Sequence, residues 1–425
     1  MMDKIFKFVE EKLLPPMAKF AEIRYLRAIR DGIISVMPVI MIGSFFILIA
    51  LFPVPAWKAL VADHVATLMI PFRLTTGLMS VYAAYGMGYA LAKTYDMDGI
   101  SGGVLSMSAF LLTAYPQPGM TAAGDALGNV IPMTGLDGSG MFTAILTMIF
   151  AVEVLRFCKE KNITIKMPPQ VPKSVSRSFE ALIPGFIIIV SVWFITHFLG
   201  FNINEALLQL FSPLVKIAGN TYIGVIIPVL FISLLWASGV HGYSIIGSIF
   251  RPVWAVLMAE NMMAVANGGV AQNIGTEGLI GLFVAIGGAG GTLAMAILFT
   301  RAKSTYLKQI GRLSIIPGIF NINEPIIFGA PVVLNPILAI PFILGPVITA
   351  STAYFAMKMD WVSRISVDMP FTVPAPISGF LATGGDWRGT VLVLFNLVLL
   401  LLIYAPFVKA YDKKMLEQEQ AGVEL

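Results

Sequence analysis

The sequence predicts an all-α polytopic membrane protein, and three observations lead to that class. Of its 425 residues, 57% are hydrophobic and 12% are charged, whereas soluble domains carry about 25% charged residues. The mean hydropathy is +0.84, which is more apolar sequence than one soluble core absorbs at this length. The apolar residues come in runs of about 20, the number that a helix needs to cross the hydrocarbon layer. A membrane β-barrel, which would show short alternating segments, is not indicated.

About ten transmembrane helices are predicted, together with two re-entrant hairpins. The ten spans are expected near residues 32–52, 74–93, 99–115, 139–157, 181–200, 221–239, 243–262, 278–300, 332–356 and 389–410. Two shorter apolar stretches, 313–331 and 366–385, are broken by Pro and Gly and are too interrupted to span. Three prolines within seven residues make the second stretch the clearer hairpin.

The basic residues support this topology. Lys and Arg cluster in the N-terminal segment, after the fourth span, after the eighth span and in the C-terminal tail. The 116–138 loop has no Lys or Arg and carries only Asp125 and Asp137. Because basic loops stay in the cytosol, ten spans with both termini cytoplasmic fit the pattern. Arg251, in the middle of the seventh span, is the exception. The net charge of +4 therefore reflects topology, and no nucleic-acid partner is expected.

Five segments follow from the composition along the chain. A basic, Pro-rich linker (161–180) lies between the fourth and fifth spans. The spans before it contain few polar residues, as a scaffold or oligomer contact would. The first segment has apolar residues on one side of a helix, which suits either the membrane surface or an ordinary lead-in helix. The segments are an amphipathic N-terminal segment (1–31), an N-terminal transmembrane scaffold or dimerisation half (32–160), a cytosolic linker (161–180), the fifth span with a C-terminal substrate half (181–411) and a cytosolic tail (412–425).

Polar residues at membrane depth are costly and usually functional, and one such group surrounds His241. Gly239 and Gly242 flank this histidine between two apolar segments. Glycines let the backbone unwind and a ligand approach, and a neutral imidazole can accept a proton from a hydroxyl. The alternative is a structural histidine bonded to a carbonyl group. We expect His241 to be catalytic and Gly242 and Tyr243 to contact the substrate.

A second group, Asn321, Asn323 and Glu324, lies just before Pro325 in an apolar run. A continuous helix is unfavourable here, and broken backbone at this depth is tolerated where it is buried in protein or lines a wet cavity. An unpaired buried carboxylate is expensive, which favours function over a helix cap with an ion pair. We expect Glu324 to be catalytic and both asparagines to bind substrate hydroxyls. The sequence FNINE also occurs at 201–205, where a plain helix start is predicted.

The third group lies in the Pro-rich stretch 369–380 and the following Asp386-Trp387-Arg388. Phe371, Thr372 and Trp387 are predicted substrate contacts: the two aromatic residues offer an apolar ring face against which a solute can stack, and Thr372 follows Phe371 directly. Asp386 and Arg388 are better explained as a cap of the last helix. Trp236 is better explained as an anchor at the membrane interface.

Four segments together resemble one known family. They are SRSFEALIPG (176–185), the His241 segment, RLSIIPGIFNINEPIIFGAPVVLNP (312–336) and PAPISGFLATGGDWRG (374–389). They look like the enzyme IIC component of the phosphoenolpyruvate-dependent sugar phosphotransferase system, in its lactose/cellobiose/diacetylchitobiose branch. The resemblance covers essentially the whole chain.

The resemblance implies a homodimer in the bacterial plasma membrane that holds a disaccharide between two re-entrant hairpins. A phosphocysteine on a partner IIB protein, itself loaded through IIA, would phosphorylate a 6-hydroxyl of the bound sugar. Glu324 matches the glutamate of the family's Asn-Glu-Pro motif, and His241 matches the histidine near the same hydroxyl. Which of them accepts the proton stays open. The single cysteine, Cys158, lies far in sequence from these residues, so the donor is expected on a separate protein.

The expected substrate is a β-linked disaccharide, with cellobiose first and diacetylchitobiose or lactose next. No cofactor and no metal are expected, and the sequence has no Gly-rich nucleotide loop of the P-loop type. Whether the chain counts as an enzyme is left open, because phosphoryl transfer requires IIB. The alternative is an ion-coupled secondary sugar transporter, since broken helices also occur in that class.

Overall fold

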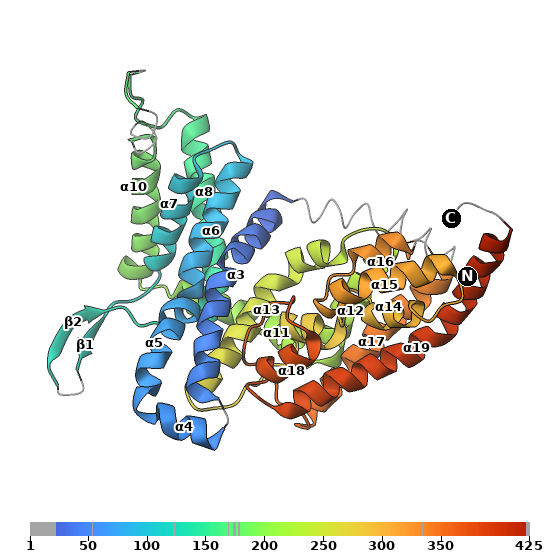
Figure 1. Ribbon diagram of the computed structural model, residues 1–425. Coiled ribbons are helices and arrows are strands. Elements are labelled where there is room, and N and C mark those ends of the chain that lie inside the picture. The colour runs from blue at the N-terminus through green and yellow to red at the C-terminus, as the bar shows by residue number, and fades with distance from the viewer. Residues whose placement is uncertain are drawn as a thin grey trace.

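The computed structural model describes residues 23–421, except 53, 122–123, 169, 173–175, 177–178, 331 and 334. The side chains of residues 44, 324 and 328 also lie outside the description. Most of the predicted amphipathic segment 1–31 and the last four residues of the predicted tail are therefore outside the described residues. The described chain is mainly helical and forms two lobes that lie side by side (Figure 1).

The N-terminal lobe is a bundle in which α3 packs against α6, and α6 packs against α7 and α8. Its helices are α3 (Arg24–Leu51), α4 (Pro55–Val61), α5 (Val65–Thr75), α6 (Met79–Thr94), α7 (Gly99–Leu111), α8 (Met141–Glu160) and α10 (Leu182–Trp193). Short turns of helix, η2 (Ala62–His64), η3 (Thr76–Leu78), η4 (Gly138–Gly140) and the π-helical η5 (Phe194–Phe198), extend or join them. A hairpin of β1 (Gln117–Met120) and antiparallel β2 (Ala126–Val130) projects from this lobe (Figure 1).

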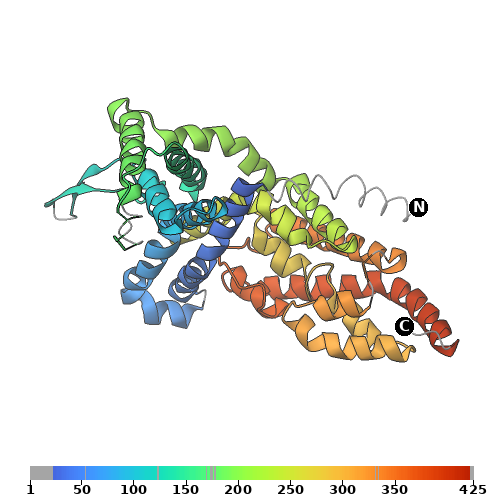
Figure 2. The same ribbon diagram turned by 90° about the horizontal axis from the view of Figure 1, so that it is seen from above.

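The C-terminal lobe places α17 against α12 and α19, and α14 against α15. Its elements are α11 (Ile203–Asn220), α12 (Tyr222–Ala237), α13 (Gly242–Ala266), the π-helical η6 (Leu279–Val284), α14 (Leu293–Phe299), α15 (Thr305–Ile319), α16 (Glu324–Gly329), α17 (Pro336–Lys358), α18 (Ala375–Ala382) and α19 (Trp387–Gln420). Helices α3 and α13 contact each other, so α3 lies at the junction of the two lobes (Figure 2).

Side-chain caps fix the starts of several helices. Asn202 Oδ1 accepts the Glu205 N–H at 3.1 Å, which confirms the predicted helix start in the first FNINE copy. Asp386 caps α19 by accepting the Arg388 N–H at 3.0 Å, and the Arg388 Nε donates to the same carboxylate at 2.8 Å. The interpretation of Asp386 and Arg388 as a helix cap is therefore confirmed.

The predicted number of spans is not confirmed by the helices in the described part of the chain. In the described part of the chain, six helices are long and apolar enough to cross a membrane, or seven if the pair 182–198 and 203–220, bent by 84°, counts as one span. The predicted spans at 99–115 and 221–239 form the shorter helices α7 and α12, with 13 and 16 residues. The prediction of about ten transmembrane helices is thus not confirmed, while the all-α membrane class is supported.

The prediction of a continuous span at 278–300 is wrong. The π-helical η6 ends at Val284, and α14 begins at Leu293. Between them Gly287, Gly288, Gly290 and Gly291 have φ of +83°, +97°, +84° and +70°. Right-handed helices require negative φ, so this glycine loop (287–291) interrupts the segment.

The two stretches predicted to be interrupted are interrupted. Asn321, with φ of +60°, lies between α15 and α16. In the other stretch, the Ser366 and Val367 N–H groups donate to the Ala382 carbonyl at 2.9 and 3.1 Å. The Ser366–Val367 segment therefore lies beside the end of α18, as in a hairpin. Whether either stretch re-enters a membrane stays a prediction.

Candidate functional site

A cavity of about 470 Å³ lies at the junction of the two lobes. Its walls come from α3, α13, the 277–289 segment that includes η6, the Asn321–Asn323 turn and the 368–371 segment. Of the predicted site residues, the cavity brings together His241, Tyr243, Asn321, Asn323 and Phe371. These residues come from three segments separated by about 50 to 80 positions in the sequence, so folding gathers them around one space.

His241 lines the cavity and also begins α13. Its Nδ1 accepts the backbone N–H of Ser244 at 3.2 Å and lies 3.0 Å from the Ser244 hydroxyl. A backbone N–H can only donate, so Nδ1 carries no proton, and a neutral ring must carry its proton on Nε2. The ring packs beside Trp236, with 4.5 Å between ring centroids. The local sequence thus fixes the tautomer and the position of the imidazole.

Asn321 connects three walls of the cavity. Its Oδ1 accepts the Gly287 N–H at 2.8 Å, and its Nδ2 donates to the carbonyls of Phe371 and Val373 at 2.6 and 3.2 Å. Both amide protons are therefore used by the protein, although the side chain lines the cavity. Asn321 holds the glycine loop and the Phe371 segment in place.

Asn323 makes a second connection to the glycine loop, because its Nδ2 donates to the Ala289 carbonyl at 2.9 Å. A Cβ atom on Gly288 would lie 2.5 Å from the Asn323 Cγ, so only glycine fits there. Glu324 follows as the first residue of α16. Its backbone continues directly from the cavity wall at Asn323, and its side chain is outside the described part of the chain.

Three predicted substrate contacts do not line the cavity. Gly242 is buried and faces the Ile232 backbone, since a Cβ there would lie 2.3 Å from the Ile232 carbonyl oxygen. Trp387 starts α19 and is 68% exposed, and Thr372 is exposed beyond Phe371. Trp236 also differs from expectation, because it is buried and lines the cavity beside His241. In the sequence, Gly242, Thr372 and Trp387 were singled out by their positions beside polar motifs. Such a position does not predict where a side chain points.

Three charged residues that sequence reasoning did not assign also line the cavity: Arg251, Glu277 and Asp368. The Arg251 Nε donates to the Glu277 Oε1 at 3.0 Å. Arg251 in the middle of a predicted span was the available signal, because charges at such positions usually mark polar pathways. Apolar residues of α3, among them Met37 and Met41, also line the cavity. The N-terminal lobe therefore forms part of the site.

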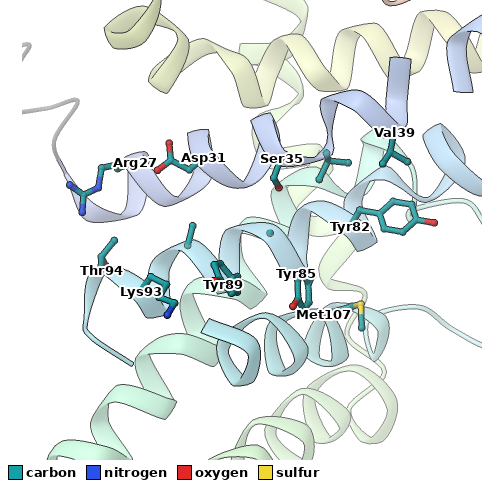
Figure 3. Close-up of a pocket in the computed structure, with 13 residues that line it drawn as sticks. Arg27, Asp31, Ser35, Val39, Tyr82, Tyr85, Tyr89, Lys93, Thr94 and Met107 are labelled. Atoms are coloured by element: carbon teal, nitrogen blue, oxygen red, sulfur yellow. The ribbon is translucent and has the colours of Figure 1, made fainter. Parts of the chain in front are cut away.

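A second hollow, an open groove of about 960 Å³, lies between α3 and α6. Figure 3 shows Arg27 and Lys93 toward one end and Val39 and Tyr82 toward the other. None of the predicted site residues lines this groove. No group of three or more His, Cys, Asp or Glu arranged to hold a metal ion occurs among the described residues.

Comparison with known proteins agrees with the resemblance seen in the sequence. The profile of the family described as Phosphotransferase system, EIIC matches residues 30–346. The chain is 39% identical to the cellobiose-specific EIIC component of Geobacillus stearothermophilus, over 99% of this chain and 97% of that protein. It is 34% identical to the lactose-specific EIICB component of Staphylococcus aureus (strain N315), over 100% of this chain and 75% of that protein.

Among solved structures, the chain resembles the transporter ChbC, the IIC component from the N,N'-diacetylchitobiose-specific phosphotransferase system. The TM-score is 0.90 with 38% identity, over 98% of this chain and 100% of that one. The family profile, the relatives and the fold agree. The chain therefore belongs to the EIIC family of the phosphotransferase system, a family of bacterial membrane permeases for sugars.

Proposed function

We propose that this chain binds a β-linked disaccharide in the central cavity, presents a 6-hydroxyl for phosphorylation and moves the sugar into the cell. The observation that carries the proposal is the meeting of His241, Asn321 and Asn323 at one cavity, although His241 lies about 80 residues from the two asparagines in sequence. Intramembrane polar groups around a cavity suit a solute with many hydroxyls. The donor is a phosphocysteine on a separate IIB protein, loaded in turn by IIA.

The two catalytic residues take different roles under this proposal. His241 donates a hydrogen bond from Nε2, because its Nδ1 is engaged by the Ser244 N–H. A neutral imidazole that donates at Nε2 cannot also accept a proton there. Glu324, which follows the cavity residue Asn323, is therefore the proton acceptor for the 6-hydroxyl. The phosphoryl group then transfers in line from the cysteine sulfur to that oxygen, and the proton passes to the carboxylate.

Cellobiose is the first candidate substrate, and diacetylchitobiose and lactose follow. The cellobiose-specific relative and the diacetylchitobiose-specific ChbC have similar identity to this chain, at 39% and 38%. The lactose-specific relative is at 34%. Its name includes a B part, and this chain matches 75% of its length.

The proposed arrangement in the cell has both termini in the cytoplasm and two copies in contact through the N-terminal half. The C-terminal half, 181–411, carries the sugar site together with α3 from the first half. The Phe371 and Asn321 segments are the tips of two re-entrant hairpins. Support comes from the basic clusters in the sequence and from the interrupted backbone at both segments.

Uptake into vesicles distinguishes this function from ion-coupled transport. Purified protein is reconstituted with IIB, IIA and the phosphoenolpyruvate-dependent enzymes inside, and labelled cellobiose, diacetylchitobiose or lactose outside. We expect sugar phosphate to accumulate only with phosphorylated IIB, and collapse of ion gradients to leave the rate unchanged. Accumulation of unmodified sugar driven by an ion gradient would establish the alternative.

The Glu324→Gln substitution tests whether the Glu324 carboxylate takes part in phosphorylation. We expect phosphorylation to fall about 100-fold or more, because proton transfer by a positioned group contributes at least that much, while sugar binding remains substantial. Glu205→Gln is the matched control, since Glu205 occupies the same place in the other FNINE copy and lies at a helix start. A normal rate in Glu324→Gln would remove the carboxylate from the mechanism.

A further inference from the structure

The short helix α16 begins at Glu324 and is held from outside at both ends. It has six residues. At about 1.5 Å per residue it is about 9 Å long, so a bond at its end also determines where its start lies. Just before its start, the Asn323 Nδ2 donates to the Ala289 carbonyl at 2.9 Å. The partner of its other end, at Gly329, therefore bears on the position of Glu324.

Tyr306, in the first turn of α15, holds the end of α16. Its hydroxyl donates to the Gly329 carbonyl at 2.6 Å. The last carbonyls of a helix have no partner within the helix, and a side-chain donor satisfies one of them here. A Cβ atom on Gly329 would lie 3.4 Å from the Ile310 side chain, so the end of α16 packs on α15 beside this bond.

The backbone of Tyr306 is in turn fixed by carboxylates of α19. Glu419 Oε1 accepts the Tyr306 N–H at 2.9 Å and the Ser304 hydroxyl at 2.7 Å. Asp412 accepts the N–H groups of Lys303 and Ser304 at 2.9 and 2.8 Å. Hydrogen bonds to an ionised acceptor are stronger than those between neutral groups. Tyr306 is therefore anchored through its backbone and reaches α16 through its hydroxyl.

Tyr306 has no direct place in the phosphorylation step proposed above, because it does not line the central cavity. An effect of its hydroxyl on the chemistry has to pass through α16. The effect is expected to be large, since a general base acts only within hydrogen-bond reach of the proton that it accepts, about 2.6–3.2 Å between heavy atoms. A small displacement of the start of α16 removes Glu324 from that range.

We propose that Tyr306 is a positioning residue for phosphoryl transfer, whose hydroxyl holds the end of α16 so that Glu324 lies within reach of the 6-hydroxyl of the sugar. This role rests on the proposed function, in which Glu324 accepts the proton. Glu419 and Asp412 supply the anchor, so the C-terminal end of α19 acts on the site through Tyr306.

The Tyr306→Phe substitution removes the hydroxyl alone. The purified full chain is assayed with phosphorylated IIB and with whichever of cellobiose, N,N'-diacetylchitobiose and lactose the unmodified chain phosphorylates fastest. We expect kcat to fall about tenfold or more, because misplacing a reacting group by about 1 Å can cost about 100-fold. We expect the Kd of the sugar and the KM for IIB to change less than about twofold, as for loss of an interaction that matters only in the transition state.

Tyr354→Phe is the matched control. The Tyr354 hydroxyl also donates to a backbone carbonyl, that of Asn220, at 2.9 Å, and Tyr354 does not line the central cavity. We expect this variant to keep the kcat of the unmodified protein. Thermal unfolding of both variants sets an assay temperature at which each is folded, so that a loss of kcat reports on the reaction.

The double variant Tyr306→Phe/Glu324→Gln separates positioning from a general structural role. Because Tyr306 acts through Glu324, we expect the double variant to be no slower than Glu324→Gln alone. A double variant that is slower by the full factor of Tyr306→Phe would overturn the positioning role. A kcat of Tyr306→Phe equal to that of Tyr354→Phe, or a loss confined to sugar affinity or to the KM for IIB, would overturn it too.

Those contrary results would leave the proposed function standing, because the unmodified chain would still phosphorylate sugar and Glu324→Gln would still be slow. A normal rate in Glu324→Gln would instead refute the carboxylate step of the proposed function, and the positioning role of Tyr306 with it.

Discussion

At the scale of single residues, His241 illustrates how one ring serves structure and chemistry through different atoms. Its Nδ1 accepts the Ser244 N–H and so satisfies one of the backbone donors left without a partner at the start of α13. The same bond places the proton of the neutral ring on Nε2. A substitution of His241 is therefore informative only if it separates the loss of the helix cap from the loss of the catalytic group.

His241→Asn makes that separation, because asparagine is a strong N-cap residue and its side chain is too short to replace Nε2. We expect the variant to unfold at nearly the temperature of the unmodified protein but to phosphorylate sugar about 100-fold more slowly. His241→Ala should lose the same activity and, in addition, about 1 kcal/mol of stability. Thermal unfolding in detergent and a IIB-dependent phosphorylation assay measure the two effects. Normal phosphorylation in His241→Asn would leave the histidine with a structural role alone.

The two FNINE copies show what a residue pattern can and cannot predict. Asn202 caps α11 as the pattern indicates, whereas Asn321 has a left-handed backbone and connects three cavity walls. The partners of Asn321 are the backbone groups of residues 34 to 52 positions away, so they come from tertiary structure. Sequence reasoning predicted Asn321 as a substrate contact, and this residue lines the cavity, but the sequence could not identify the protein atoms that its amide binds.

At the scale of elements, the glycine loop 287–291 turns an expected span into two short helical pieces. Composition alone did not reveal the break, because glycines are also common where transmembrane helices pack closely. By contrast, the break at 320–324 was predictable, since two amides, a carboxylate and a proline stand together there. Apolar patterns thus located the long helices α13, α17 and α19 well. They failed at the glycine loop 287–291, where the conformation of the glycines determines the path of the backbone.

The Gly288→Ala substitution tests whether the glycine loop 287–291 requires a glycine at position 288. Alanine at a φ of +97° costs about 1–2 kcal/mol in strain, and its Cβ would also meet Asn323 at 2.5 Å. We expect a lower unfolding temperature and weaker sugar binding. Gly281→Ala is the matched control for stability, because a Cβ at Gly281 has no neighbour within 4 Å. An equal unfolding temperature for the two variants would mean that the loop tolerates side chains.

The C-terminal end of α19 holds the start of α15 through Glu419. This carboxylate accepts the Ser304 hydroxyl at 2.7 Å and the Tyr306 N–H at 2.9 Å, and these bonds lower the pKa of Glu419. A lowered folded-state pKa stabilises the protein above the ordinary glutamate pKa of about 4.3, and that stabilisation is lost as the pH falls through the lowered value.

We therefore expect Glu419→Ala to unfold at a lower temperature than the unmodified protein at pH 7, and the difference to disappear in acid. Glu417→Ala is the control, since Glu417 is 64% exposed and its Lys413 partner lies at 3.9 Å. Thermal unfolding at pH 7 and below pH 4 measures both variants. A difference that persists unchanged at the lower pH would show that the charge of Glu419 is not its source.

At the scale of the whole molecule, the single cysteine makes the orientation in the membrane testable. Cys158 is buried near the end of α8, and Cys158→Ser leaves a chain without thiols. In that background we expect Met120→Cys, on the exposed β1 strand, to react with a membrane-impermeant maleimide on intact cells. Lys413→Cys, at an 80% exposed side chain of α19, should react only after the membrane is opened. The reverse pattern would invert the proposed topology.

The membrane class and the family were predictable from the sequence, because hydropathy and long motifs do not depend on the packing of the helices. The contribution of α3 to the cavity was not predictable. Its wall residues are ordinary apolar residues of a membrane helix, and nothing in Met37 or Met41 distinguishes a cavity wall from a lipid-facing surface. Only the packing of α3 against α13 gives them that position.

The placement of α3 has a mechanical consequence. A cavity whose walls belong to two lobes changes shape when the lobes slide or tilt past each other. Under the proposed function, we expect loading and release of sugar to involve a shift along the α3–α13 contact. Bulky replacements on the inward side of α3 should therefore alter how quickly cargo enters and leaves, although this helix carries none of the reacting groups.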